Sequence, residues 1–238
     1  MIGEVNSLNQ IPVIIDCDPG IDDTMMLMLA FARPELDVRL VTTEAGNLTI
    51  DKTTYNALSF LTYINKHVEV ARGLPQPLFR KQEVAEDIHG EGGLGNVKWA
   101  DPAFEASKRP AIQAMYDTLM HSTEPITIVA TGPLTNIAAL LIAHPEVKPN
   151  IKQISWMGGS AVGGNMSTTA EFNAYVDPHA AELVMRAGVP IIMSGLDVTH
   201  KAYITRDEMA HLRTLGTPFA EKVADMMQFY TFTQKQTP

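Results

Sequence analysis

The chain has 238 residues, of which 45% are hydrophobic and 19% charged, and this composition is typical of one globular domain with a sizeable core. Its formal net charge of -9 argues against a protein that binds nucleic acid or an anionic membrane. A small neutral or cationic substrate is the partner class that this charge favours.

The single cysteine, Cys17, excludes an internal disulfide framework, and the 13 methionines suit a reduced interior. Because Cys17 alternates with Asp16 and Asp18, we expect it to pack in the core rather than act as a nucleophile. The first ten residues lack the basic stretch and apolar core of a signal peptide, and no apolar run approaches the ~20 residues of a membrane span. The sequence therefore predicts a cytoplasmic protein without a membrane segment.

The first predicted unit is a buried strand at Val13–Ile15, followed by a helix over Asp22–Arg33. Between them, Asp16–Asp23 reads DCDPGIDD and holds four carboxylates in a turn that contains Pro19 and Gly20. Carboxylates this close need a cation, a helix N-terminus or hydrogen-bond donors to compensate their charge. Since oxygen ligands without a nearby His or Cys suit Ca²⁺ or Mg²⁺ better than zinc, the motif predicts a cation site, and we favour Ca²⁺.

The same four acids have a simpler interpretation. In it, Asp22 caps the helix and Asp23 lies in the first helical turn, while Asp16 and Asp18 are solvated loop residues. We prefer a functional site, because open α/β sheets place their sites at the carboxyl ends of strands, where these acids lie.

The next units repeat the order of strand and helix. A strand at Val38–Val41 leads to a helix over Ile50–Lys66, and a short third strand follows at Val68–Ala71. Asn47 lies at the carboxyl end of the second strand, as the acids do at the first. It can hydrogen-bond a polar ligand there, or it can be a turn residue after Gly46.

A long, glycine-rich segment occupies residues 72–101. Loops of this length in compact domains tend to be lids or binding loops. His89 lies near its centre, where it can approach a ligand as an acid or hydrogen-bond donor, or can simply be exposed.

The second half of the chain continues the alternation. The predicted strands are Ile126–Ala130, Ile151–Trp156 and Pro190–Met193, and the predicted helices are Ala111–His121, Pro133–Leu141, Pro178–Ala187, one ending near Leu215, and Pro218–Gln236. The turn Thr131–Asn136 offers backbone carbonyls to the same metal. The glycines after the fifth strand do not spell GxGxxG, which argues against a dinucleotide site. Glu171 and Asn173 point the same way if their stretch is extended, and they would suit the hydroxyls of a sugar.

These elements predict one α/β domain over residues 1–238. We expect a mainly parallel, open, Rossmann-like sheet that is flanked by helices and wound with right-handed crossovers. Its site should lie at the carboxyl ends of the strands.

Six segments, in order, resemble the inosine-uridine preferring nucleoside hydrolase family. They are DCDPGIDD (Asp16–Asp23), EAGN (Glu44–Asn47), IHGEGGLG (Ile88–Gly95), ATGPLTNIA (Ala130–Ala138), MGGS (Met157–Ser160) and AEFN (Ala170–Asn173). The resemblance covers nearly the whole chain. It implies a calcium-dependent hydrolase of the N-ribosidic bond that acts in nucleoside salvage as a homodimer or homotetramer.

The resemblance also implies a role for each matching residue. Asp18 and Asp23 would bind Ca²⁺ together with the backbone carbonyl of Thr131, and Asp18 would take a proton from the attacking water. His89 would lie on the side of the base. Five residues would hold the ribose: Asp22, Asn47, Met157, Glu171 and Asn173. Neither the residues nor the resemblance indicates whether purines or pyrimidines are preferred.

The chain departs from the family at its C-terminal end, and two other functional classes are possible interpretations of the sequence. A C-terminal His-Asp pair of the family has no counterpart before Pro238, so we expect the chain to lack that segment, to bind metal less well and to hydrolyse slowly. A Mg²⁺-dependent phosphatase of the haloacid-dehalogenase type is one alternative, since it also has DxD after a strand, although its later Lys and acidic pair are not evident. A non-catalytic protein that binds nucleosides or metal is the other.

Overall fold

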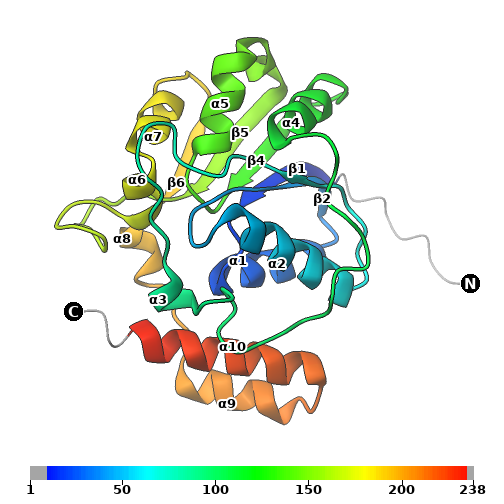
Figure 1. The fold of residues 1–238 in the computed structure, drawn as a ribbon, viewed down its shortest axis with the longest axis vertical. Helices are drawn as coiled ribbons and strands as arrows, with labels where there is room; N and C mark the ends of the chain where they lie inside the picture. The colour runs from blue at the N-terminus through cyan, green and yellow to red at the C-terminus, as the bar shows by residue number, and fades with distance from the viewer. Residues whose placement is uncertain (1–9, 235–238) are drawn as a thin grey trace, which may run out of the picture.

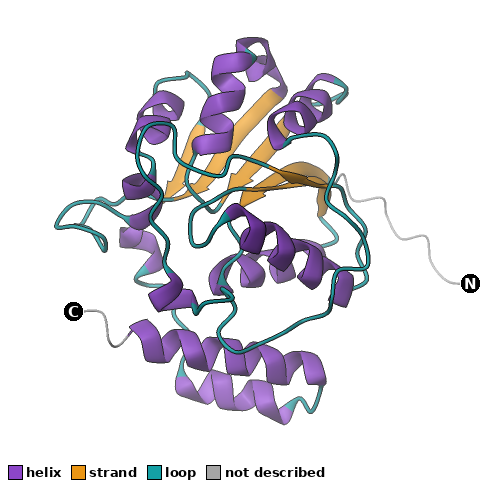
Figure 2. Cartoon of the chain, viewed as in Figure 1, coloured by secondary structure: helices purple, strands orange, loops and turns teal. Residues whose placement is uncertain are grey.

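The computed structural model describes residues 10–234, and its centre is one sheet of six strands in the order β3-β2-β1-β4-β5-β6 (Figures 1 and 2). All neighbouring strands are parallel. The strands are β1 (Ile11–Cys17), β2 (Leu36–Thr43), β3 (Val70–Arg72), β4 (Ile126–Ala130), β5 (Ile151–Met157) and β6 (Ile191–Ser194). The α/β class with an open parallel sheet is therefore confirmed.

Helices cover both faces of this sheet. They are α1 (Ile21–Ala32), α2 (Ile50–Tyr63), α3 (Glu86–His89), α4 (Ala111–Met120), α5 (Thr135–Ala143), the 3₁₀ helix η1 (Pro145–Asn150), α6 (Phe172–Val176), α7 (Pro178–Met185), α8 (Leu196–Thr199), α9 (Arg206–Thr214) and α10 (Pro218–Gln234). The helices α4, α5 and α7 pack on one face, and α1 and α2 pack on the other (Figure 1). The helix α10 contacts α1 and α3, and α9 packs on α10. None of the helices within residues 10–234 is long and apolar enough to cross a membrane.

The strand β1 shows how the sequence produces these two cores. Its residues alternate between faces, so Ile14 packs in the cluster under α4 and α5, whereas Val13 and Ile15 pack in the cluster under α1 and α2. Both faces of a central parallel strand are buried, which explains the continuous apolar run. Cys17 is fully buried in the second cluster, as its alternation predicts.

Some predicted boundaries are wrong. The helix α5 begins at Thr135 rather than at Pro133, because the backbone at Pro133 still belongs to the turn after β4. The strand β3 begins at Val70, two residues later than predicted. The short helices α3, α6 and α8 were not predicted, since four or five residues are too few to show a helical period. The predicted end of the last helix, at Lys235 and Gln236, lies outside the described residues.

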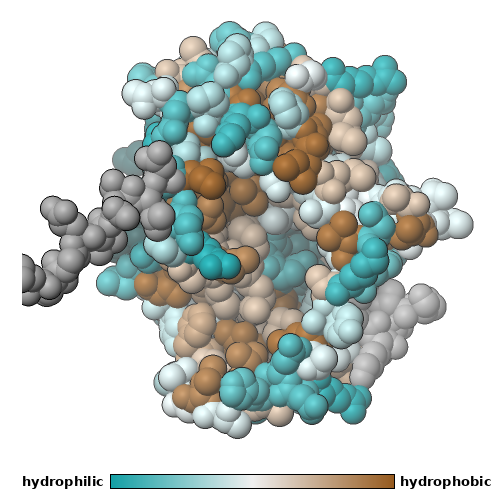
Figure 3. Space-filling view, turned by 180° about the vertical axis from the view of Figure 1, so that it is seen from behind, coloured by the Kyte–Doolittle hydropathy of each residue, from teal (hydrophilic) through white to brown (hydrophobic). Residues whose placement is uncertain are grey.

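The surface carries scattered apolar side chains. Figure 3 shows the face opposite to that of Figure 1, where apolar and polar side chains are interspersed. The edge strand β6 contributes Ile192, which is 53% exposed, and α1 contributes Leu29. These residues lie apart from the strand ends that hold the candidate site.

Candidate active site at the strand ends

The candidate site lies where β1 and β4 end side by side. These strands are neighbours in the sheet, but α1, which follows β1, packs on one face and α5, which follows β4, packs on the other. Loops that diverge in this way open a crevice at the carboxyl ends of the strands, which is the usual ligand position in such sheets. The loop after β1 carries Asp18, the first turn of α1 carries Asp22 and Asp23, and the loop after β4 carries Thr131.

Asp18 is fully buried just past the end of β1. Its Oδ2 atom accepts a hydrogen bond from the backbone N–H of Asn47 at 2.6 Å, whereas its Oδ1 atom has no hydrogen-bond partner. Two glycines make room for the carboxylate, because a Cβ on Gly46 or Gly132 would come within 2.1 Å or 2.8 Å of its oxygen atoms. The interpretation of Asp18 as a solvated loop residue is therefore wrong, and one of its oxygens remains free to bind a ligand.

Asp23 is also buried, and hydrogen bonds connect it to the loop after β2 and to the loop after β4. Its Oδ1 atom accepts from the hydroxyl of Thr131 at 2.6 Å, and its Oδ2 atom accepts from the side-chain amide of Asn47 at 3.0 Å. Because the backbone of Asn47 holds Asp18, this one residue binds both carboxylates. The structure thus brings Asp18, Asp23, Asn47 and Thr131 together, as the sequence predicts.

The electrostatics of these acids favour a cation. Burial raises the pKa of Asp18 well above its ordinary value, and the nearby charge of Asp23 raises it further. Burial, followed by the charge of Asp22, raises the pKa of Asp23 to about 6. No lysine or arginine in the described part of the chain forms an ion pair with Asp18 or Asp23. The ionised carboxylates therefore lack a compensating charge from the protein.

The available ligand atoms fit a hard cation. Asp18 and Asp23 supply carboxylate oxygens, and the carbonyl of Thr131 keeps a second lone pair after it accepts a hydrogen bond from Asn173. An all-oxygen set of this kind suits Ca²⁺. Within residues 10–234, no three acidic, histidine or cysteine side chains are placed to hold a metal ion by themselves. The unpartnered, buried Oδ1 of Asp18 is the observation that best fits a bound cation.

Asn173 and Met157 lie next to the candidate metal ligands, and Glu171 does not have the predicted conformation. The side-chain amide of Asn173 donates to the carbonyls of Thr131 and Met157 at 2.8 Å and 2.9 Å. The expectation of an extended stretch is wrong, because Phe172–Val176 forms α6 and Glu171 is its N-cap. The Glu171 carboxylate accepts three backbone N–H groups there, at 2.8 Å to 3.1 Å. The alternation of Glu171 and Asn173 suggests an extended stretch, and five residues are too few to show a helical period instead.

His89 is buried at the end of α3, not exposed as one interpretation of the loop had it. Its Nδ1 atom accepts the backbone N–H of Ile21 at 3.2 Å, and its ring stacks on Tyr230 with the ring centres 5.7 Å apart. Burial lowers the pKa of His89 to about 4. The ring is therefore neutral at pH 7, and since Nδ1 is an acceptor, Nε2 carries the proton.

Asp22 is the most exposed of the predicted site residues, since 54% of its side chain is exposed. Its Oδ1 atom lies 3.9 Å from Nδ1 of His89. This position leaves the Asp22 carboxylate open to a substrate that enters the crevice.

Three buried polar residues behind the site were not among the predicted site residues: Asp16, Glu44 and Asn136. Asp16 accepts hydrogen bonds from Thr42 and Asn136, and burial raises its pKa to about 7. Burial and the charge of Asp16 raise the pKa of Glu44 well above its ordinary value. The signal for Asp16 and Glu44 was their position, because each is a polar residue at a strand end, whereas Asn136 lies in the first turn of α5.

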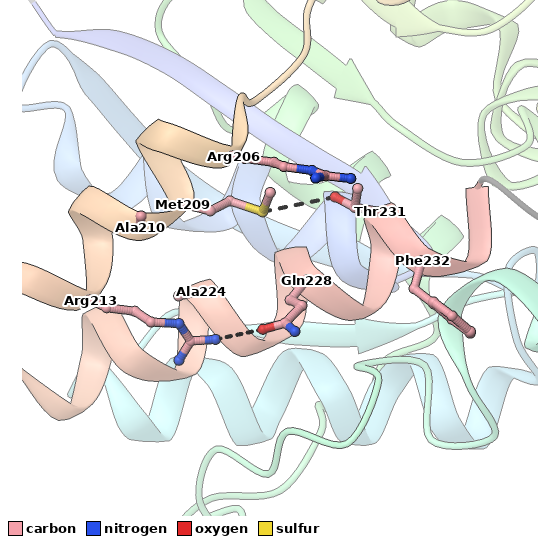
Figure 4. A pocket seen from close by; sticks show the side chains of 8 residues that line it. All are labelled: Arg206, Met209, Ala210, Arg213, Ala224, Gln228, Thr231 and Phe232. Atoms are coloured by element: carbon pink, nitrogen blue, oxygen red, sulfur yellow. Dashed lines mark hydrogen bonds between the residues drawn. The ribbon is translucent and has the colours of Figure 1, made fainter.

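Two surface hollows are lined by other residues than the predicted site residues. One, of about 420 Å³, is a groove between α9 and α10, where Arg213 reaches Gln228 and Thr231 reaches Met209 (Figure 4). It contains none of the predicted site residues. A second, of about 900 Å³, lies between α2 and residues 90–101 and also lacks them. The chemistry at the strand ends therefore locates the candidate site better than the size of a hollow does.

Comparison with known proteins identifies the class. The model of the family "Inosine-uridine preferring nucleoside hydrolase" matches residues 13–238. The chain belongs to this family. It is accordingly a nucleoside hydrolase, an enzyme that hydrolyses N-glycosidic bonds, and the resemblance of the six segments is confirmed. A phosphatase of the haloacid-dehalogenase type is therefore excluded.

Individual relatives agree with this assignment. The pyrimidine-specific ribonucleoside hydrolase RihA of Photobacterium profundum is 48% identical over 220 residues, which cover 92% of this chain and 71% of that protein. RihA of Escherichia coli is 46% identical over 221 residues, with the same coverage. The solved structure of a purine-preferring ribonucleoside hydrolase from Gardnerella vaginalis is similar with a TM-score of 0.91 and 34% identity, over 95% of this chain and 73% of that one.

Proposed function

We propose that this nucleoside hydrolase uses Ca²⁺ to split ribonucleosides into ribose and free base in nucleoside salvage. The observation that carries the proposal is the unpartnered Oδ1 of Asp18, which is fully buried in the crevice between β1 and β4. A buried carboxylate oxygen without a donor is costly unless a ligand binds it. Asp18, Asp23 and the carbonyl of Thr131 would hold the ion, which would lower the pKa of the attacking water.

Asp18 is the proposed general base. Asn47 holds one of its oxygens and leaves the other free, so Asp18 can accept a proton from water without changing its position. The acids nearby also favour the positive charge that develops on the sugar when the glycosidic bond breaks.

The remaining residues would orient the substrate. Asp22, Asn47, Met157, Glu171 and Asn173 are proposed to hold the ribose. His89 is proposed to face the base, where its Nε2–H could donate a hydrogen bond to the departing base. That role needs a neutral ring with a proton on Nε2, and both follow from its burial and from its bond to Ile21.

We further propose a preference for pyrimidine ribonucleosides. Relatives that share 46% to 48% of their residues with this chain are named pyrimidine-specific, whereas the Gardnerella enzyme, at 34% identity, is named purine-preferring. The test is ribose release from uridine, cytidine and inosine, each with Ca²⁺ and with a chelator. Faster hydrolysis of inosine than of uridine and cytidine would contradict the base preference. Equal rates with Ca²⁺ and with chelator would contradict the dependence on the metal.

We also propose a cytoplasmic location and a homo-oligomeric assembly. The single cysteine and the many methionines favour the cytoplasm, and the family resemblance favours a homodimer or homotetramer. Light scattering coupled to size-exclusion chromatography would measure the assembly, and a monomeric mass would contradict this part of the proposal.

A further inference from the structure

The side-chain amide of Asn136 connects several loops behind the site. Its Nδ2 atom donates to Oδ1 of Asp16 at 2.9 Å and to the carbonyl of Thr43 at 3.1 Å. Its Oδ1 atom accepts the backbone N–H of Leu74 at 2.9 Å. Asn136 lies in the first turn of α5, and its three partners lie at the ends of β1 and β2 and just after β3. One fully buried amide therefore joins four segments.

The amide has no room to move. A Cβ at Gly73 would come within 2.3 Å of both Nδ2 and Oδ1 of Asn136, so the glycine backbone lies directly against the amide. Both N–H bonds of the amide and its oxygen are used, which makes this a fully satisfied buried polar group. A group that is both satisfied and confined holds its partners in one arrangement.

The position of Asn136 matters because the sheet stops short of the site. The pairing of β1 with β4 ends at Asp16 and Ala130. Asp18 and Thr131, the proposed metal ligands, lie just beyond that point. Past the last pair, the backbone N–H of Thr131 donates to the carbonyl of Asp16 at 3.0 Å, and the amide of Asn136, at the start of α5, makes a second connection to Asp16.

We propose that Asn136 is a positioning residue that fixes the separation of Asp18 and Thr131 and so sets the affinity for the metal. The inference rests on the proposed calcium dependence. It assigns to Asn136 no contact with the metal or the substrate. Its effect passes through the segment after β4, in which Thr131 precedes Asn136 at the start of α5, and through the end of β1, where Asp16 precedes Asp18.

Thr42 provides a matched control. Its hydroxyl donates to the same Oδ1 atom of Asp16, at 2.6 Å. Thr42 belongs to β2, however, so its bond stays within the sheet and does not reach the loop after β4. Removing either side chain deprives Asp16 of a donor, but only the change at Asn136 also releases the bridge between the two loops. Asn150, which donates to the carbonyl of Leu119 at 2.8 Å, is a control remote from the site.

The experiment compares Asn136→Ala, Thr42→Val and Asn150→Ala in the full chain. Calcium affinity is measured by calorimetry and by terbium luminescence, and the melting temperature is measured without metal. Loss of a residue that orients metal ligands typically costs about 10- to 100-fold in metal affinity, and we expect a loss of that size in Asn136→Ala. Thr42→Val and Asn150→Ala should melt earlier than the wild type but bind Ca²⁺ as the wild type does. Saturating Ca²⁺ should restore much of the kcat of Asn136→Ala.

Two results would overturn the inference. One is a calcium affinity of Asn136→Ala equal to that of Thr42→Val, and the other is an equal loss in all three variants. If Asn136→Ala does not fold, Asn136→Ser keeps a polar group in the first turn of α5 but is too short to reach Asp16, and it gives the same readout. A wild-type protein that binds no Ca²⁺ overturns the proposed function and this inference together, whereas equal calcium affinity of the wild type and Asn136→Ala overturns only the inference.

Discussion

Gly46 lies so close to Asp18 that a Cβ at residue 46 would come within 2.1 Å of Oδ2 of the carboxylate. The φ angle of Gly46 is not positive, so the backbone conformation allows alanine, but the space beside Asp18 does not. We expect Gly46→Ala to displace the Asp18 carboxylate and, since a shift of ~1 Å at a reacting group can cost about 10²-fold, to lower kcat by that order. Ribose release at saturating Ca²⁺ is the measurement.

Gly92 is the control for this substitution. A Cβ there would meet no atom within 4 Å, and its φ angle is not positive either. Gly92→Ala should therefore keep the wild-type rate. Equal rates for the two variants would show that the carboxylate of Asp18 can move without loss.

Replacing Asp18 by asparagine should separate activity from stability. The substitution keeps the shape and the acceptor for the N–H of Asn47, but it removes the proposed base, and we expect kcat to fall by about 10² to 10⁴. Because burial opposes ionisation of Asp18, the metal-free variant should melt at a higher temperature than the metal-free wild type at pH 7. Near-normal turnover in Asp18→Asn would remove Asp18 from the mechanism.

The sequence predicts the sheet and the residues that meet at the strand ends because both depend on local patterns. Continuous apolar runs mark the buried strands, and polar residues directly after them mark the strand ends. Asp18, Asp23, Asn47 and Thr131 follow from that rule, and the structure brings all four together.

The rest depends on partners far away along the chain. His89 is buried because it meets Ile21, 68 residues earlier, and Tyr230 of α10. The amide of Asn136 meets Asp16 across 120 residues. No local period reports such contacts. The prediction of an extended stretch at Glu171 is wrong for another reason, since a helix of five residues has too few turns to show its period.

Discrimination against 2′-deoxynucleosides is expected to be strong. The proposed contacts lie around the sugar and the metal, and a missing hydroxyl would remove the group that these polar side chains are proposed to bind. Sites built to bind a hydroxyl reject analogues that lack it by about 10⁴ to 10⁵ in kcat/KM. Equal kcat/KM for uridine and 2′-deoxyuridine would contradict recognition of the ribose.

The metal-free enzyme should lose stability as the pH rises. The pKa of Asp23 is raised to about 6 and that of Asp16 to about 7, from an ordinary value of 3.8, so the folded state keeps protons that the unfolded chain has already released. Stability therefore falls between about pH 4 and pH 7. His89 acts in the opposite direction, because its pKa is lowered to about 4 and its contribution rises with pH up to its ordinary 6.5.

The carboxylates should dominate the pH dependence of stability, since Asp18 and Glu44 also have raised pKa values and only His89 opposes them in the site. We expect the melting temperature in chelator to fall from about pH 5 to pH 8, with most of the fall below pH 7. Bound Ca²⁺ stabilises the ionised carboxylates, so saturating Ca²⁺ should flatten or reverse the slope. Asp16→Asn, which removes one titrating group two residues from Asp18, should reduce the slope in chelator. A melting temperature that rises with pH in chelator would show that these acids are ionised in the folded protein without a metal.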